Sequence, residues 1–235
     1  FIHNPKPRTD AEKLHPAKFP ESLVKEFILF FTKTGELVLD PFVGTGSTLV
    51  ACDETGRKGV GVELLEKYAA IARQRTKQKV IVGDSLSVSI NQQVDFIITS
   101  PPYGPMLNKK GLAQKKRMGK KLDTAYSEDE NDLGNVRDYD SFVQKVSLVF
   151  QRLKATVKDG GYVVIILQNY RDGKIYRPLA YDVVRALSSD FLFVGERIWC
   201  QDNKTLYPYG LGYSYVPNVH HHVCLIMRKN VDQKI

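Results

Sequence analysis

Cysteine is scarce in this chain, and its few cysteines form no pattern that points to a metal or a disulfide. Cys52, Cys200 and Cys224 are far apart, and no CxxC pair is present. Such spacing argues against a structural zinc site and a disulfide framework, so we expect no metal. It is typical of a reducing compartment, which we expect to be the cytoplasm.

Long apolar runs are missing as well. No segment approaches the ~20 consecutive apolar residues of a membrane-spanning helix, so no membrane association is expected. A signal-peptide pattern is also absent. The chain begins at Phe1 and not at Met, which is compatible with trimming or processing of an upstream segment.

The chain does contain enough apolar sequence for one large domain. Its 235 residues are 43% hydrophobic, a fraction typical of a globular protein. We predict a single domain over 1–235, with an insertion at 104–139 and a second, tyrosine-rich loop at 200–219. The net charge of +8 favours a polyanionic partner, although only weakly.

Short apolar runs alternate with segments of helical spacing. The runs predicted to be strands are 37–39, 59–62, 80–82, 94–99, 162–167, 191–194 and 223–227. Helical spacing is found at 21–31, 49–56, 64–74, 142–153 and 179–187. This order predicts a parallel α/β sheet, which binds ligands at the carboxyl ends of its strands. Residues 1–20 are predicted to form an irregular surface arm.

The first predicted strand runs into a glycine turn at Asp40–Thr48, with the sequence DPFVGTGST. Strand, glycine turn and helix together form the arrangement that cradles nucleotides. Glycines let the backbone approach a ligand, and the helix N-terminus offers free N–H groups. The turn is not the GxGxxG of dinucleotide enzymes, because Leu49 occupies the third position.

Acidic residues follow the next two strands. Glu63 lies about 20 residues after the glycine turn, a spacing at which a carboxylate accepts the hydroxyls of a ribose. A charge at the start of the following helix is the structural alternative. Asp84 is placed to accept the amine of an adenine or to cap a turn. Because Asp40, Glu63, Asp84 and Ser100 all end predicted strands, we favour a ligand site.

The fourth strand stops at Thr99–Gly104, with the sequence TSPPYG. Its two prolines have φ fixed near ~−65°, which makes the loop stiff. Oxygen acceptors beside the Tyr103 ring suit a planar substrate that carries an amine. An ordinary Pro-Pro turn is the alternative that these six residues alone leave open.

Residues 104–139 carry a basic cluster followed by an acidic one. The basic residues are Lys109, Lys110, Lys115, Lys116, Arg117, Lys120 and Lys121. We expect them to contact nucleic-acid phosphates, with a solvated loop as the alternative. The histidines at 220–222 are expected to be structural, because neighbouring strand residues point to opposite faces and make a poor metal site.

Together, the glycine turn, Glu63, Asp84 and the TSPPY loop resemble the S-adenosylmethionine-dependent amino-methyltransferases of DNA. The segment His15–Glu21 (HPAKFPE) resembles the one that these enzymes place before the glycine turn. The resemblance extends from about His15 to Lys229. It implies a Rossmann-like class I methyltransferase fold, with a seven-stranded mostly parallel sheet, helices on both faces and an antiparallel last strand.

The resemblance also implies roles. S-adenosylmethionine would be the cofactor, its methionine part held by the glycine turn, its ribose by Glu63 and its adenine amine by Asp84. The residues expected to bind it are Lys18, Phe19, Pro20, Asp40, Phe42, Gly44, Gly46, Ser47, Thr48, Glu63, Asp84 and Ser85. The catalytic residues would be Ser100, Pro101, Pro102 and Tyr103, which receive a base flipped out of double-stranded DNA.

The loop signature bears on the target atom. In that family Asp-Pro-Pro-Tyr or Asn-Pro-Pro-Tyr usually accompanies adenine N6, and Ser-Pro-Pro-Tyr more often cytosine N4. Ser100 therefore favours cytosine N4, with adenine N6 as the first alternative. An RNA guanine-N2 methyltransferase and a catalytically silent nucleic-acid-binding subunit are further alternatives. Cytosine C5 methylation is not expected, because no Cys follows a Pro.

Many members of that family carry a separate target-recognition domain, often within a restriction-modification system. None is evident here. DNA sequence would then be read by 104–139, by 200–219, by an N-terminal region, or by a homodimer partner or separate recognition subunit.

Overall fold

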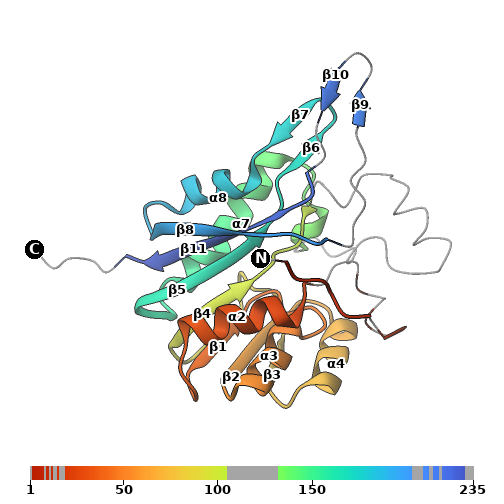
Figure 1. The fold of residues 1–235 in the computed structure, drawn as a ribbon. Helices are drawn as coiled ribbons and strands as arrows, with labels where there is room; N and C mark the ends of the chain where they lie inside the picture. Colours follow the sequence, from red (N-terminus) through yellow and green to blue (C-terminus); the bar gives the residue numbers. More distant parts are fainter. Residues whose placement is uncertain are drawn as a thin grey trace, which may run out of the picture.

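A computed structural model gives the arrangement of these segments (Figure 1). It describes residues 2–7, 9–10, 12, 15, 19–104, 132–202 and 219–230, and the backbone of 209–211 and 214–216.

A seven-stranded sheet forms the centre of the molecule, in the order β3-β2-β1-β4-β5-β11-β8. Its strands are β1 (Leu37–Asp40), β2 (Lys58–Glu63), β3 (Lys79–Val82), β4 (Val94–Thr99), β5 (Val157–Leu167), β8 (Phe191–Trp199) and β11 (His222–Lys229). The strands from β3 across to β5 are parallel, and β11 is antiparallel to both of its neighbours. The predicted sheet, with its antiparallel last strand, is confirmed.

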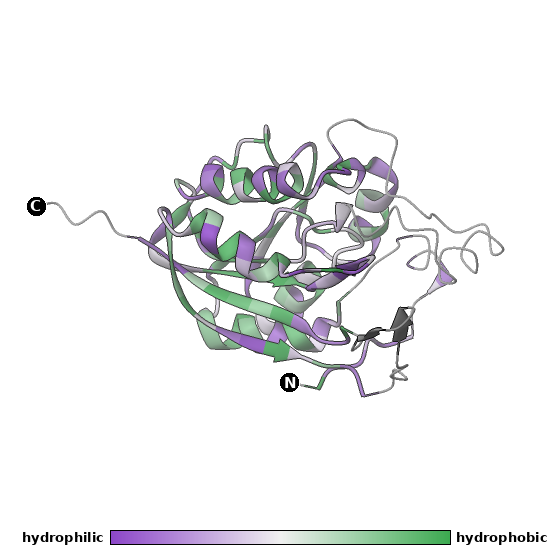
Figure 2. Cartoon of the chain, turned by 90° about the horizontal axis from the view of Figure 1, so that it is seen from above, coloured by the Kyte–Doolittle hydropathy of each residue, from purple (hydrophilic) through white to green (hydrophobic). Residues whose placement is uncertain are grey.

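Helices cover both faces of the sheet (Figure 1). The helices α2 (Glu21–Phe31), α3 (Ser47–Thr55) and α4 (Glu66–Arg75) lie on one side, and α7 (Tyr139–Leu153) and α8 (Leu179–Leu187) on the other. Neighbours along β4 accordingly enter different cores: Ile97 packs on the α7 side, Phe96 and Ile98 on the α2 side. Burial on both faces explains why the strands are continuous apolar runs in the sequence. Figure 2 shows these hydrophobic strands enclosed by helices with hydrophilic outer positions.

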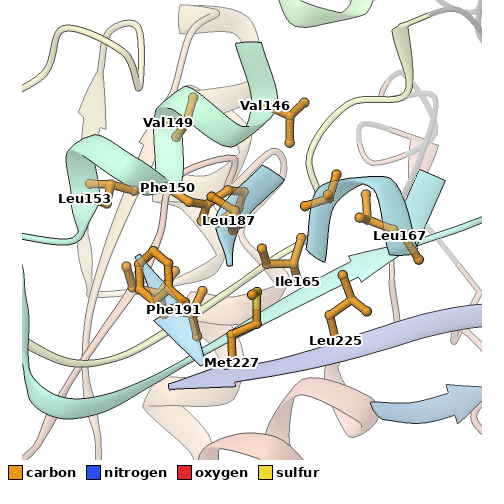
Figure 3. Close-up of a cluster of buried hydrophobic side chains, with 14 of the residues drawn as sticks. Val146, Val149, Phe150, Leu153, Ile165, Leu167, Leu187, Phe191, Leu225 and Met227 are labelled. Atoms are coloured by element: carbon orange, nitrogen blue, oxygen red, sulfur yellow. The ribbon is translucent and has the colours of Figure 1, made fainter. Parts of the chain in front are cut away.

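Helix α7 illustrates how the core is built. Its first turn is capped by Asp138, whose carboxylate accepts the Ser141 N–H at 2.8 Å. Its apolar stripe then packs over β5, β8 and β11, with Phe150 beside Ile165 and Met227 (Figure 3). Each such side chain stabilises the fold by about 1.5–3 kcal/mol when fully buried.

Two strands differ from their predicted bounds. β5 begins at Val157, five residues before the predicted start, and its pairing with β4 shifts register near Gly160, where φ is +72°. β8 continues to Trp199 through its pairing with β11, and partly buried and exposed positions alternate along it from Gly195 to Ile198. Because Glu196 and Arg197 interrupt the apolar residues, this part of β8 is not a continuous apolar run and was not predicted to be a strand.

Two small hairpins and a 3-10 turn were not predicted. The hairpins are β6 (Tyr170–Asp172) with β7 (Ile175–Arg177), and β9 (Tyr209–Leu211) with β10 (Ser214–Val216). The turn, η1 (Leu133–Asn135), is capped by Asp132. Three-residue strands are too short to show a period.

The start of the predicted surface arm is attached to the end of β8. Ile2 forms a bridge with Cys200, and the Trp199 indole N–H donates to the His3 carbonyl at 2.8 Å. The His3 ring also contacts Glu26 of α2. Residues 2–4 therefore lie along the sheet edge instead of projecting freely.

Candidate functional site

Two adjoining pockets open at the carboxyl edge of the parallel strands. Each holds about 560 Å³, its open mouth included, which lies within the range of small-molecule sites. The first is lined by Pro41, Glu63, Leu64, Leu65, Asp84, Ser85, Pro102, Asp132 and Leu133, among others. The second is lined by Phe19, Gly44, Thr45, Ser47, Pro101, Tyr103, Trp199 and His222, among others. They share His15, Phe42 and Ser100, so they form one continuous cleft.

The two glycines of the turn face different parts of the molecule. Gly44 (φ +53°) faces the cleft, and a Cβ there would lie 3.2 Å from the His15 ring. Gly46 (φ +88°) faces α4, and a Cβ there would lie 3.1 Å from Ala72. We expected both glycines to admit a ligand. Gly44 lines the second pocket, where contact with a ligand stays a prediction, whereas the absence of a side chain at Gly46 allows α4 to pack closely.

Asp40 is fully buried and surrounded by protein donors. Its carboxylate accepts the hydroxyls of Thr48 at 2.5 Å and Thr99 at 2.6 Å, and the Phe42 N–H at 3.0 Å. Burial raises its pKa to about 6, although these three hydrogen bonds act to lower it. Neither Asp40 nor Thr48 lines either pocket. Both hold the glycine turn in shape, and their predicted contact with the cofactor stays a prediction.

Glu63, at the end of β2, is held by two backbone groups. The Gly44 N–H and the Leu65 N–H each donate to one carboxylate oxygen at 3.0 Å. Burial raises the pKa of Glu63 to about 7, and the nearby Asp40 and Asp132 add to that rise. A carboxylate accepts about four hydrogen bonds, so two positions remain for donors inside the first pocket.

Asp84 and Ser85, which follow the neighbouring strand β3, also line the first pocket. Asp84 Oδ1 accepts the Leu86 N–H at 2.9 Å, an Asx turn that leaves Oδ2 as the acceptor for a ligand. The Ser85 hydroxyl donates to the Pro41 carbonyl and ties this turn to the glycine turn. Apolar walls between Glu63 and Asp84 come from Phe42, Leu65 and Pro102.

Ser100 stands between the two pockets, and Tyr103 orients it. The buried Tyr103 hydroxyl donates to the Ile166 carbonyl at 3.3 Å and lies 3.4 Å from Ser100 Oγ. Burial raises the Tyr103 pKa, so the phenol keeps its single proton. Because that proton points at a carbonyl, Ser100 is the donor to Tyr103, which leaves its oxygen lone pairs as hydrogen-bond acceptors.

An ion cluster joins the N-terminal segment to the glycine turn. The Arg75 guanidinium contacts Glu21 at 2.6 Å and Glu12 at 2.9 Å, and it donates to the Thr45 carbonyl. The segment so held carries His15, whose ring meets Tyr68 edge-on at 4.6 Å. His15 lines both pockets and was not among the predicted site residues, although it begins the HPAKFPE segment.

Two further residues of the second pocket come from the distant end of the chain. Trp199 ends β8 and His222 begins β11, and their rings stack at 4.3 Å. His220, the first of the three adjacent histidines, lies within 3.2 Å of the Gln201 carbonyl, in keeping with the structural role expected for it. His222 departs from that expectation, because it lines the pocket.

Most of the predicted site residues converge on the cleft. Those that line it are Phe19, Phe42, Gly44, Ser47, Glu63, Asp84, Ser85, Ser100, Pro101, Pro102 and Tyr103. Pro20 instead precedes α2 as its N-cap. Lys18 and the seven basic residues between Lys109 and Lys121 lie outside the described residues. Asp132, Leu133, Thr45 and Leu64 line the cleft without having been predicted.

The described residues contain neither a group of metal-binding side chains nor a membrane-spanning helix. Among them, no three His, Cys, Asp or Glu side chains group in a way that would hold a metal ion. No helix in that part of the chain is both long and apolar enough to cross a membrane.

Sequence comparison finds similarity in the N-terminal third of the chain. Residues 1–74 match a family model described as DNA methylase. The chain is 40% identical over 68 residues to orphan methyltransferase M.BamHII of Bacillus amyloliquefaciens, covering 29% of this chain and 26% of that protein. It is 44% identical over 61 residues to type II methyltransferase M2.DpnII of Streptococcus pneumoniae, covering 26% and 23%. The predicted resemblance is thus confirmed in this region. The chain spans about a quarter of the length of these relatives.

Comparison of structures establishes the fold over nearly the whole chain. A putative rRNA-methylase from Clostridium thermocellum has a TM-score of 0.55 at 12% identity, with 92% of this chain and 100% of that one covered. Magnesium protoporphyrin IX methyltransferase from Synechocystis, solved with bound SAM, has a TM-score of 0.52 at 12% identity, covering 89% and 79%. The chain has the predicted class I methyltransferase fold.

Proposed function

We propose, from the premise that residues 1–74 carry a DNA methylase sequence on a class I methyltransferase fold, that this chain methylates DNA. The reaction would be transfer of a methyl group to the exocyclic amine of a flipped base, with cytosine N4 as the favoured atom. The observation that carries the proposal is that Ser100 lines both pockets, which differ in chemistry, with its hydroxyl 3.4 Å from that of Tyr103.

The first pocket fits the adenosine part of S-adenosylmethionine. Its two ends carry carboxylates with unused acceptor positions, Glu63 for the ribose hydroxyls and Asp84 for the adenine amine. Flat apolar walls between them suit a purine. Gly44, Thr45 and Ser47 would hold the methionine part in the second pocket, under His15. When bound, the cofactor supplies an electrophilic methyl group on a sulfonium.

The acceptor loop would supply orientation and fixed dipoles. An aromatic amine is a weak nucleophile because its lone pair is conjugated with the ring. Acceptance of its two N–H bonds by Ser100 Oγ and the Pro101 carbonyl would turn that lone pair out of conjugation and aim it toward the cofactor. Most of the gain would come from such positioning. Serine is a weaker acceptor than aspartate, so the amine proton would leave after methyl transfer.

The target base would lie in the second pocket among aromatic side chains. Tyr103, Trp199 and His222 line it together with Ser100, and aromatic faces stack on any extruded base. We favour DNA over RNA because the sequence match is to a DNA methylase, whereas the likeness to an rRNA-methylase is one of fold. We favour cytosine N4 over adenine N6 because Ser100 replaces the acidic or amide residue usual at N6-specific sites.

Methylome sequencing of DNA from a host that expresses the chain tests this proposal. The expected result is N4-methylcytosine in one sequence context, which nucleoside analysis of the same DNA would verify. N6-methyladenine would overturn the cytosine assignment while keeping the DNA methylase. Methyl transfer from labelled cofactor to RNA alone would overturn the DNA assignment, and no transfer to either would favour a silent binding subunit.

Tyr103→Phe tests the orientation of Ser100. The variant keeps the ring but removes the hydroxyl that accepts from Ser100, so the serine proton becomes free to point at the substrate amine. We expect turnover to fall roughly 2- to 12-fold, the equivalent of one hydrogen bond, with cofactor affinity unchanged. Calorimetric titration with S-adenosylhomocysteine checks affinity, and an unchanged turnover would refute the orienting role.

The basic cluster of the 104–139 insertion is proposed to contact DNA phosphates. Replacing Lys115, Lys116 and Arg117 by glutamine should lower the slope of log affinity against log salt by about 2 to 3, roughly 0.9 for each lost phosphate contact. Fluorescence anisotropy with a duplex measures that slope. The matched control replaces the exposed residues Lys33, Lys58 and Lys145. Equal slopes for both triple variants would make the cluster a solvated loop.

A further inference from the structure

The β6–β7 hairpin is the element near the cleft that the proposed chemistry leaves unused. It leaves the sheet directly after β5, and Figure 1 shows it extending beyond the end of that strand. Ile166 of β5 accepts the Tyr103 hydroxyl, and Tyr170 starts the hairpin four residues later. Four residues span at most about 14 Å, so the base of the hairpin starts within that distance of the Tyr103 contact.

The base of the hairpin is fixed to the body of the protein. The Tyr170 ring meets Tyr139 of α7 edge-on at 6.3 Å, and the Arg177 guanidinium lies over the same Tyr139 ring at 4.6 Å. The Ala180 N–H donates to the buried Asn169 side chain at 2.9 Å, which anchors the chain on both sides of the hairpin. A tip mounted on such a base keeps its position when it meets a partner.

The tip, in contrast, exposes apolar and aromatic surface. Ile175 is 54% exposed and Tyr176 is 41% exposed, beside the exposed Lys174 of the turn. In the hairpin register Arg171 pairs with Tyr176, and its guanidinium lies 5.5 Å from the Tyr176 ring centre. Tyr170 and Arg177 pair on the other face, the one packed on α7. The face turned away from α7 therefore carries the Arg171 guanidinium against the Tyr176 ring, whereas Ile175 alternates onto the same side as Arg177.

Charge and shape together favour a nucleic acid as the partner of this tip. The hairpin has three basic side chains, Arg171, Lys174 and Arg177, against the single acid Asp172. An aromatic ring with a cation over it is a surface on which nucleobases stack, and an exposed isoleucine is a common wedge between base steps. The hairpin follows β5, whose Ile166 carbonyl accepts the Tyr103 hydroxyl, so a contact with DNA near the target base is compatible with its place in the chain.

We propose that the hairpin tip enters the duplex next to the target base, where Tyr176 stacks on the bases left exposed when the target is extruded. This inference rests on the proposed function. It assigns to Tyr176 the role of holding the duplex open, separate from the role of Ser100 on the extruded amine. The cost of extrusion is smallest for an unpaired base, so the contribution of Tyr176 depends on how the target is paired.

The test compares Tyr176→Ala on two substrates. Both are synthetic duplexes with the site that methylome sequencing returns, one fully paired and one with an abasic site opposite the target. We expect single-turnover methylation of the paired duplex to fall roughly 10- to 100-fold, the effect of losing one base-stacking aromatic. On the abasic duplex the loss should be less than about threefold. Tyr176→Phe should behave as wild type.

Tyr181→Ala is the matched control. Tyr181 is 47% exposed on α8 and lies outside the cleft, so its loss should leave both rates unchanged. Equal losses by Tyr176→Ala on the two duplexes, or none, would overturn the proposal. So would a changed oligomeric state in sedimentation, which would make the tip a contact between copies. If the wild type methylates neither duplex, the proposed function itself fails, and that outcome is distinct from these.

Discussion

Replacing Ser100 by alanine should slow methyl transfer to DNA by about 10²- to 10³-fold, the usual cost of removing one preorganised polar group from a reacting centre. The variant loses the oxygen that would orient the amine at the junction of the two pockets. Cofactor affinity should change less than about threefold, since Glu63, Asp84 and Gly44 are untouched. Single-turnover rates with labelled cofactor, together with calorimetric titration of S-adenosylhomocysteine, separate the two effects.

Ser100→Asn sharpens this test. Its amide oxygen supplies an acceptor at the same backbone position, so we expect it to recover part of the rate that Ser100→Ala loses. The control is Ser189→Ala, which removes an exposed hydroxyl in the turn between α8 and β8. Equal losses of turnover and of cofactor affinity in Ser100→Ala would contradict the catalytic role and make Ser100 part of the cofactor pocket.

Cofactor affinity should fall about tenfold between pH 8 and pH 6, and Glu63 is the reason. Its pKa in the ligand-free protein is raised to about 7 by burial, whereas acceptance of two ribose hydroxyls requires the ionised carboxylate. Below pH 7 the carboxyl must lose a proton before it binds, which weakens affinity about tenfold per pH unit. Calorimetric titration with S-adenosylhomocysteine, whose sulfur carries no charge, measures this slope directly.

The Glu63→Gln variant supplies the comparison. It should bind the ligand weakly, with affinity almost independent of pH between 6 and 8. The exposed Glu66→Gln, in the first turn of α4, should keep the pH slope of the wild type. A wild-type affinity that does not change over this range would remove Glu63 from the ribose site.

The free energy of unfolding should decrease as pH rises, whereas cofactor affinity should increase. A carboxyl whose pKa is raised on folding binds a proton that the unfolded chain has already lost between about pH 4.5 and 7. The stability it contributes is present below pH 4.5 and is lost as pH rises through 7. The thermal midpoint of the ligand-free wild type, relative to Glu63→Gln, should therefore decline from pH 5 to pH 8. Cofactor binding thus requires the ionised form of Glu63, whereas the folded protein is more stable when Glu63 is protonated.

The fold was largely predictable because the sheet is buried on both faces. Strands such as β4 then appear as unbroken apolar runs, which a one-dimensional search detects. Where one face is open the signal weakens, and the second half of β8, with Glu196 and Arg197, was missed. The β6–β7 hairpin was missed because pairing in three-residue strands is decided by the turn at Gly173, not by a period.

The residues of the candidate site also differ in whether the local sequence could predict them. Residues within one strand–loop–helix unit, such as Glu63 and Ser100, carry a local chemical pattern. Trp199 and His222 carry none, since the pairing of β8 with β11 alone brings them to Tyr103. Arg75 is a similar case, because a basic residue in the last turn of a helix is ordinary until Glu12, Glu21 and Thr45 are seen around it.

Asp40, at the end of β1, joins the start of α3 to the end of β4 at the place where methyl donor and acceptor would meet. Its carboxylate binds Thr48, at the start of α3, and Thr99, at the end of β4. Thr48 belongs to the part that matches DNA methylases in sequence, and Thr99 begins the acceptor loop. A misplacement of ~1 Å between reacting atoms can cost about 10²-fold in rate. We infer that this buried carboxylate sets the distance between the two reactants without contacting either of them.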